Sequence, residues 1–243
     1  MQLIKLDAID STNDFLKAMA NDQITENFTV VTAENQTKGK GQMGAKWSSE
    51  TGKNLIMSIL IKDVLSDIRE IYNLNVAVSV AVIAALEKYN IPKLSIKWPN
   101  DIMADSKKIG GILIENTIKS AIDIVSVVGI GLNVNQKEFS NLPKASSLSI
   151  IVNADFDKDL ILAEIVKTIK TNVEILKVGK AEILWKCYSS LLFKVQIPMP
   201  FQVSSGKPFM GIIQGVSEDG KLQLLLEDDS IQTYEIKEIQ MLY

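Results

Sequence analysis

Histidine is absent from the 243-residue chain, and cysteine and arginine occur once each, as Cys187 and Arg69. Without histidine there can be no Ser-His-Asp or Cys-His nucleophile, no histidine base and no His-ligated zinc. A single cysteine excludes internal disulfides and cysteine-rich metal or iron–sulfur sites. Any anion site must therefore be built from lysine ammonium groups, backbone N–H groups and helix N-termini.

The chain also lacks a basic excess and a long hydrophobic run. It carries 26 basic and 29 acidic residues, a net charge of −3, which disfavours a general nucleic-acid binder. The most apolar stretch, residues 74–86, is shorter than the about 20 residues of a membrane span. The first six residues are too short and polar for a signal peptide. We therefore expect a cytoplasmic protein that binds neither nucleic acid nor membrane.

Periodicity predicts an α/β protein of the α+β type, with a mixed, largely antiparallel sheet and packed helices. The expected strands cover residues 3–6, 28–32, 54–62, 94–97, 102–103, 109–115 and 122–134. The expected helices cover residues 14–20, 73–89, 157–176 and 180–192. Beyond these, proline and glycine separate short β-rich runs, which is typical of a small antiparallel barrel. We therefore predict two domains, 1–194 and 195–243.

Three segments carry residues suited to chemistry. In the glycine loop (residues 39–47, Gly-Lys-Gly-Gln-Met-Gly-Ala-Lys-Trp) three glycines let the backbone approach an anion, and Trp47 offers a ring face. The alternative for this segment is a flexible surface loop. In Lys97-Trp98-Pro99-Asn100-Asp101, the oxygens of Asn100 and Asp101 suit magnesium. A hairpin can return Lys108 to the face of Lys97. The alternative there is a structured turn followed by a solvated charge pair.

The third segment is Gly129-Ile130-Gly131-Leu132-Asn133-Val134-Asn135. Its glycines could leave room for a ring to pack against the strand, and the side-chain amide of Asn133 could form hydrogen bonds with the edge of a base. Considered alone, the segment is better explained as a strand that contains a bulge and is followed by polar residues.

Taken together, these segments resemble the biotin protein ligases. The matching elements occur in order: Asp10-Ser11-Thr12-Asn13, then Gln36 before the glycine loop, then Lys97–Asp101 with Lys108, then Gly129–Asn133. The resemblance covers essentially the whole chain and is closest to the short form without an N-terminal DNA-binding domain. It implies a class II synthetase-like catalytic domain followed by an SH3-like barrel.

The resemblance also implies a reaction. Biotin attacks the α-phosphate of ATP, and a lysine of the biotin carboxyl carrier protein then takes the biotinyl group from biotinyl-5′-AMP. Two anions about 3.5 Å apart repel each other by roughly 5 kcal/mol at an effective dielectric constant near 20. Lys108 matches the family lysine that contacts both anions. Magnesium would offset phosphate charge, with Asp101 as its ligand.

The resemblance assigns roles residue by residue. Catalysis falls to Lys108 and Lys40; biotin contacts to Ser11, Thr12, Asn13, Gln36, Lys40, Gly41, Gln42 and Lys108; ATP contacts to Gly39, Gly41, Gly44, Trp47, Lys97, Asn100 and Asn133; and a metal to Asp101. Trp47 is expected to pack on adenine, with Asn133 at its edge. This chain departs from the family at Lys40, Gln42 and Met43, where arginines are common, and Gln42 loses the charge altogether.

Other functions remain open at this stage. Lipoate and octanoate transferases share the fold and also load carrier lysines, although their arginine-rich and histidine-containing motifs are absent here. A non-catalytic module that only binds biotin or a carrier is a second alternative. A transcriptional repressor is disfavoured by the acidic balance. Both monomer and homodimer are compatible with the sequence.

Overall fold

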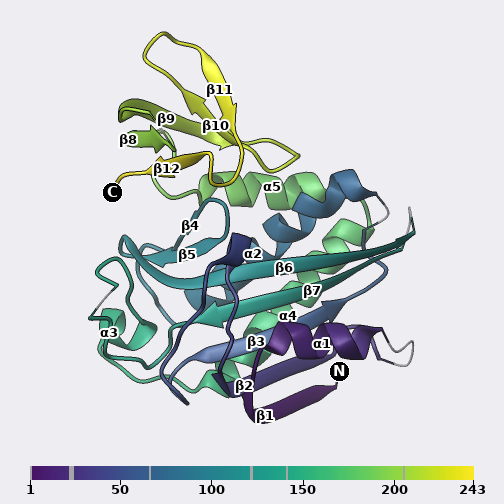
Figure 1. Ribbon diagram of the computed structural model, residues 1–243. Coiled ribbons are helices and arrows are strands. Elements are labelled where there is room, and N and C mark those ends of the chain that lie inside the picture. Colours follow the sequence, from purple (N-terminus) through teal and green to yellow (C-terminus); the bar gives the residue numbers. More distant parts are fainter. Residues whose placement is uncertain (1, 22–24, 66, 121–122, 141, 205) are drawn as a thin grey trace.

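The larger part of the molecule is built on a seven-stranded sheet (Figure 1). The computed structural model describes residues 2–21, 25–65, 67–120, 123–140, 142–204 and 206–243. The strand order is β1-β2-β3-β7-β6-β5-β4. The bounds are β1 Leu3–Ile9, β2 Val30–Gln36, β3 Leu55–Ile61, β4 Ser95–Lys97, β5 Asp101–Ala104, β6 Lys107–Ser120 and β7 Asp123–Leu132. β1 and β2 pair in parallel and the other neighbours are antiparallel, which confirms the mixed, largely antiparallel sheet.

Helices cover both faces of this sheet. Helix α1 (Thr12–Ala20) packs on β3 and β7, and α4 (Lys158–Lys177) packs on β3, α2 (Ile71–Glu87) and α5 (Ala181–Ser190). Strand β3 is buried along its whole length. Its residues alternate between a small core under α1, which contains Leu60, and the main core with α2, which contains Ile59. Two buried faces explain why this strand reads as a continuous apolar run.

Helix α2 is the centre of the main core. Eleven of its 17 residues are buried, including both small and large apolar side chains. The stretch Ile68–Glu87, which includes this helix, is long and apolar enough to cross a membrane by length and composition. Because most of its surface is covered by protein, it has the character of a core helix, as its apolar composition on all sides predicts.

The chain ends in a five-stranded antiparallel sheet that forms the small barrel. Its strand order is β11-β10-β9-β8-β12. The bounds are β8 Pro198–Val203, β9 Phe209–Val216, β10 Leu222–Leu225, β11 Ile231–Tyr234 and β12 Ile239–Met241. Buried barrel residues such as Phe201 and Leu224 belong to the same hydrophobic cluster as α2. The barrel is therefore seated on the larger part of the molecule, and a domain boundary at 194/195 stays a prediction.

The structure contains short elements that periodicity did not predict. These are α3 (Leu148–Val152) and two single-turn 3₁₀ helices, η1 (Gln42–Gly44) and η2 (Ile68–Glu70). Elements of three to five residues hold too few turns for a helical period to be visible. The predicted strand 122–134 begins at Ile122, which lies outside the described residues.

Candidate functional site

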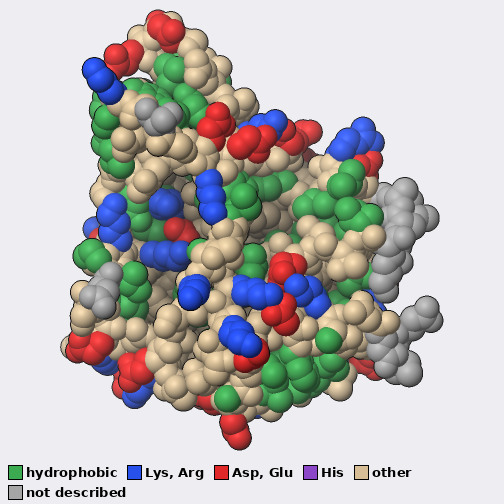
Figure 2. Space-filling model, viewed as in Figure 1, with side chains coloured by type: hydrophobic (Ala, Val, Ile, Leu, Met, Phe, Trp, Pro, Cys, Tyr) green, Lys and Arg blue, Asp and Glu red, His purple; other side chains and the backbone are tan. Residues whose placement is uncertain are grey.

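A cavity of about 460 Å³ lies between the sheet, the glycine loop and the barrel. Lysine side chains gather around the hollow beneath the barrel in the space-filling view (Figure 2). Most of the predicted site residues line this cavity: Ser11, Thr12, Asn13, Gln36, Lys40, Gly41, Gln42, Trp47, Lys97, Asn100 and Lys108. Segments that are far apart in sequence thus meet at one concave site, as a ligand-binding enzyme requires.

One end of the cavity is formed by a network of polar groups, which we call the polar end (Thr12, Asn13, Gln36 and Ser58). The first three line the cavity, and Ser58 bonds to two of them. Gln36 Oε1 accepts hydrogen bonds from the Thr12 amide at 2.8 Å and from Thr12 Oγ1 at 3.0 Å. Ser58 Oγ contacts Thr12 Oγ1 at 2.8 Å and Asn13 Oδ1 at 2.6 Å. Thr12, Asn13 and Ser58 are buried, so this network is fixed before any ligand arrives.

Helix α1 begins at this end for local reasons. Ser11 is its N-cap, and the Ser11 hydroxyl accepts a hydrogen bond from the amide of Asp14. The Asn13 side chain donates to Glu115 Oε2 at 2.8 Å. A Cβ atom at position 129 would lie 2.4 Å from Asn13 Oδ1. Glycine at 129 therefore lets the first turn of the helix reach the sheet.

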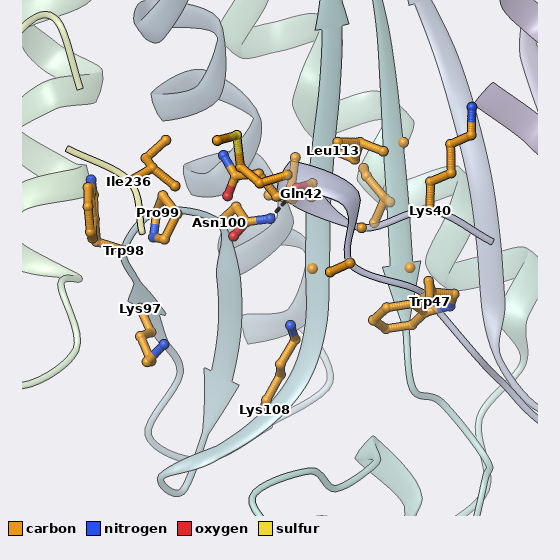
Figure 3. Close-up of a pocket in the computed structure, with 18 of the residues that line it drawn as sticks. Lys40, Gln42, Trp47, Lys97, Trp98, Pro99, Asn100, Lys108, Leu113 and Ile236 are labelled. Atoms are coloured by element: carbon orange, nitrogen blue, oxygen red, sulfur yellow. Dashed lines mark hydrogen bonds between the residues drawn. The ribbon is translucent and has the colours of Figure 1, made fainter. Parts of the chain in front are cut away.

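The opposite side of the cavity carries a lysine pair joined by one carboxylate. Asp101 lies 2.5 Å from Lys108 Nζ and 3.4 Å from Lys97 Nζ. The hairpin between β5 and β6 creates this arrangement, and Figure 3 shows the two lysines directed toward the same space. Asp101 itself does not line the cavity. Its carboxylate holds two ammonium groups at the edge of the cavity.

Neighbouring groups fix the geometry of this pair. The side-chain amide of Asn100 donates to the Ile112 carbonyl at 2.7 Å, which ties the residue before β5 to β6. Lys97 Nζ lies 5.6 Å from the ring centroid of Tyr243. Burial, and then the negative charge of Asp101, raise the pKa of the Tyr243 hydroxyl. The C-terminal segment of the described chain thus packs beside the lysine pair.

The described residues do not present a ready metal site. Among them there is no cluster of three or more acidic or cysteine side chains. Asp101 is engaged by two ammonium groups, so a cation would have to displace both lysines to use it. The predicted role of Asp101 as a metal ligand does not fit this arrangement and stays a prediction.

The glycine loop folds as a small hairpin over the sheet. The Trp47 amide donates to the Gly39 carbonyl at 3.0 Å, and the Gly41 amide donates to the Ala45 carbonyl at 2.7 Å. The Trp47 ring lies against Gly131, where a Cβ atom would come within 2.5 Å of the ring. Among the described residues, Trp47 Nε1 has no hydrogen-bond partner although it is buried. A buried donor without a partner is uncommon, and a ligand could bond to it only if the loop shifted.

Lys40 lies on the loop but its ammonium group is turned away from the lysine pair (Figure 3). It contacts Asp14 Oδ1 at 2.6 Å. The hydrogen bond from Lys40 lowers the pKa of the Asp14 carboxyl. A direct catalytic role for Lys40 requires this ion pair to open, and it stays a prediction.

Four other predicted residues lie outside the cavity lining: Gly39, Gly44, Asp101 and Asn133. Gly39 and Gly44 belong to the loop hairpin. Asn133 is buried, and its side-chain amide donates to the Ser146 carbonyl at 3.0 Å. That bond ties the end of β7 to the segment before α3. The structure thus gives Asn133 a structural contact, and its contact with adenine stays a prediction.

Sequence reasoning missed several residues of the site. Ser58 is one, and it carries a detectable signal because it is the polar residue within the otherwise apolar strand β3. Glu115, which accepts from Asn13 and from Lys17 at 2.6 Å, had no such signal. The barrel residues of the lining, among them Ile236 and Lys237, were also missed. No local pattern places a C-terminal barrel over an N-terminal loop.

Comparison with known proteins places the chain among ligases. The family described as "Biotin/lipoate A/B protein ligase family" matches residues 6–135. The biotin–[acetyl-CoA-carboxylase] ligase of Mycobacterium tuberculosis is 26% identical over 217 residues, covering 88% of this chain and 79% of that protein. The bifunctional ligase/repressor BirA of Bacillus spizizenii is 35% identical over 135 residues, 56% of this chain. The chain spans 41% of the length of that relative.

A solved structure is similar over nearly the entire length. The biotin protein ligase of Aquifex aeolicus, in complex with biotin and ATP, superimposes with a TM-score of 0.80 at 28% identity. The alignment covers 99% of this chain and 98% of that one. The sheet, the helices and the small barrel therefore form one known arrangement, which confirms the predicted fold.

Proposed function

The chain belongs to the Biotin/lipoate A/B protein ligase family, and on this premise we propose that it is a biotin–[acetyl-CoA-carboxylase] ligase. It would attach biotin to one lysine of a biotin carboxyl carrier protein, with ATP as the second substrate. The observation that carries the proposal is the pairing of a buried polar end with two cavity lysines. The polar end suits an uncharged polar ring system, and the two lysines suit two anions.

The reaction has two steps. A carboxylate oxygen of biotin forms a bond to the α-phosphorus of ATP, and the bond from that phosphorus to the bridging oxygen breaks, releasing pyrophosphate. The carrier lysine amine then attacks the acyl carbon of biotinyl-5′-AMP; AMP leaves and the amine loses a proton. Neither step needs histidine or a covalent enzyme intermediate. Both need positive charge and exact positioning.

In this mechanism Lys108 bridges the carboxylate of biotin and the α-phosphate. Its present partner, Asp101, keeps the ammonium at the cavity edge in the absence of substrate. When the two substrate anions enter, Lys108 exchanges one carboxylate for two anionic oxygens, while Lys97 remains beside Asp101. The gain is largest at the transition state, where charge is most concentrated.

The polar end receives the ureido ring of biotin. It offers both hydrogen-bond donors and hydrogen-bond acceptors, from the hydroxyl groups of Ser11 and Thr12 and the side-chain amides of Asn13 and Gln36. Ser58 orients two of these groups. The Gly41 and Gln42 segment lies over the linkage between biotin and the nucleotide, and the unpartnered Trp47 Nε1 and its ring face the nucleotide.

Magnesium bound together with ATP would supply charge neutralisation for the leaving pyrophosphate. The chain itself contributes the ammonium groups of Lys97 and Lys108, which Asp101 holds at the cavity edge. We further propose a cytoplasmic protein, monomeric or homodimeric, whose partners are ATP, biotin and the carrier domain, with no nucleic acid.

The proposal is tested by incubating the protein with ATP, magnesium, radiolabelled biotin and a carrier domain. We expect label in the carrier and biotin-dependent release of pyrophosphate. A carrier whose target lysine is replaced by arginine should stay unlabelled. A parallel reaction with radiolabelled lipoate separates biotin ligases from lipoate ligases. Label from lipoate but not from biotin, or ATP that is not consumed, would contradict the proposal.

A further inference from the structure

The barrel supplies a side chain that reaches the glycine loop. Lys237 lies between β11 and β12, lines the cavity, and donates from Nζ to the Met43 carbonyl at 2.5 Å. Met43 is at the loop tip within η1, with φ of 54° and 58% of its side chain exposed. A residue near the C-terminus is thus bonded to the outermost point of a loop near the N-terminus.

Other contacts attach the barrel to the rest of the molecule. The indole Nε1 of Trp98 donates to the Gly220 carbonyl at 2.9 Å in a buried position. Trp98 belongs to the segment that carries Lys97 and Asn100, so the barrel is fixed to the lysine side of the cavity. The barrel also shares its hydrophobic core with α2. Lys237 can therefore restrain the loop without the barrel itself moving.

The loop tip has few other restraints. The bond from the Ala45 amide to the Gln42 carbonyl, 3.2 Å long, closes the tip on itself and does not join it to the rest of the molecule. Outside the tip, Lys40 reaches Asp14 and Trp47 lies on Gly131. Between these two anchors, the Lys237 bond holds the loop tip against the barrel.

Lys237 differs from three of the other cavity lysines in its partner. Lys40, Lys97 and Lys108 each contact a carboxylate, whereas Lys237 contacts a neutral carbonyl. An arriving phosphate competes for the first three by displacing a charged partner. In the ligand-free structure Lys237 is therefore bonded to the loop backbone rather than paired with an acidic side chain.

We propose that Lys237 is a positioning residue that latches the glycine loop to the barrel and slows escape of the acyl-adenylate from the cavity. The retention role rests on the proposed function; the latch itself does not, because the contact exists without ligand. The latch compensates for the uncharged Gln42, which leaves the loop without a cation at that position. It also gives the barrel a part in holding the intermediate between the two steps of the reaction.

The latch is tested first on the ligand-free protein by limited trypsin digestion. Trypsin cuts after lysine, and Lys40 and Lys46 lie within the loop. Cleavage of a transiently open segment follows the population of the open form. We expect Lys237→Met to speed cleavage at these two sites by about three- to tenfold, since a typical hydrogen bond contributes on that scale. Lys237→Arg should restore the parental rate.

Lys207→Met is the matched control, because Lys207 is an exposed barrel lysine outside the cavity lining. It should digest like the parent. Thermal melting of each variant separates a loosened loop from a destabilised fold. Unchanged cleavage at Lys40 and Lys46 in Lys237→Met would overturn the latch.

The retention role is tested on protein loaded with radiolabelled biotinyl-AMP. After dilution into unlabelled intermediate, we expect faster loss of label from Lys237→Met and parental loss from Lys237→Arg, with the saturated rate of pyrophosphate release changed little. Faster cleavage with unchanged loss of label would overturn retention. If the parent forms no adenylate at all, the proposed function fails, and the digestion result still decides the latch.

Discussion

At the polar end of the cavity, the side chains are buried and bonded to one another; at the glycine loop they are exposed and held by single contacts. Thr12, Asn13 and Ser58 form a closed network under α1. The loop tip carries Met43, more than half exposed, and relies on Lys237. One end is therefore organised before binding, whereas the other can open to admit substrate.

This difference matches what each end has to do. A ring system buried away from water must find every hydrogen bond ready, because an unmet buried polar group costs about 1–3 kcal/mol. In the proposed reaction, the nucleotide end has to admit ATP, release pyrophosphate and later expose the acyl carbon to a carrier lysine. A loop held by separable contacts permits that sequence. The lysine pair lies between the two ends, where the two substrates meet.

The largest effect is expected from Lys108→Ala, which removes the charge at this meeting point. Repulsion of roughly 5 kcal/mol between the reacting anions would no longer be offset. We expect biotin-dependent pyrophosphate release to fall by about three to four orders of magnitude. The fold should persist, because Lys108 lies at the cavity edge rather than in the core.

Lys107→Ala is the matched control for that variant. Lys107 is the preceding residue, is exposed, and donates to the Pro143 carbonyl at 2.7 Å. It should keep near-parental activity. Near-normal pyrophosphate release by Lys108→Ala, measured beside this control, would remove Lys108 from its proposed role.

Two glycine variants separate the ends of the cavity. In Gly129→Ala the new Cβ would lie 2.4 Å from Asn13 Oδ1, and in Gly131→Ala it would lie 2.5 Å from the Trp47 ring. We expect Gly129→Ala to raise KM for biotin, and Gly131→Ala to raise KM for ATP, each by about 10- to 100-fold, the range of a few kcal/mol of strain.

The contrast between the two glycine variants is itself the control, since both add one methyl group to β7. Steady-state kinetics with each substrate varied in turn would measure it. If both variants changed the same KM, the cavity would not be divided into a biotin end and a nucleotide end.

Ser58→Ala tests the polar end without adding volume. The variant loses the hydroxyl that contacts Thr12 and Asn13, so these two side chains are no longer held in place for biotin. We expect KM for biotin to rise by about tenfold, which corresponds to the free energy of one hydrogen bond. Ser126→Ala is the control: Ser126 is also buried, but its hydroxyl contacts Asn116 Oδ1 at 2.7 Å rather than Thr12 or Asn13. A similar loss of stability in both, with KM changed in neither, would contradict the proposed network.

The sequence predicted the fold well because its elements are long and strongly patterned. The apolar run of β3 and the all-apolar α2 each follow from burial on both sides. The short α3 and η1 escaped prediction because their length hides any period. The parallel pairing of β1 with β2 was covered only by the general expectation of a mixed sheet, since strand order depends on contacts between distant segments.

The candidate site was predictable where motif residues are also the contacting residues. Thr12, Gln36 and Lys108 are examples, and all line the cavity. Asn133 shows the limit, because the sequence did not indicate that its side-chain amide donates to the Ser146 carbonyl; its contact with adenine stays a prediction. Lys237 shows the other limit. Its position over the loop is set by how the barrel is seated, which no local pattern contains.

The smallest effect is expected at position 42, where Gln42 lines the cavity from the loop tip. In Gln42→Arg a planar guanidinium could form two hydrogen bonds with a phosphate and add charge to the flexible end. We expect loss of biotinyl-AMP to slow by about three- to fivefold, the equivalent of up to 1 kcal/mol for an ion pair that stays partly solvated. Dilution of the labelled complex measures it, and equal loss from variant and parent would count against this role.

The same substitution in the Lys237→Met background sharpens the comparison further. Residue 42 lies in the loop tip and residue 237 contacts that tip from the barrel, so the effects of the two substitutions on the release rate should not simply add. If Lys237 holds the loop and an arginine at 42 holds the intermediate, the arginine should recover less retention in a loop that is no longer latched. Full additivity of the two changes in release rate would mean that the loop and the barrel act independently.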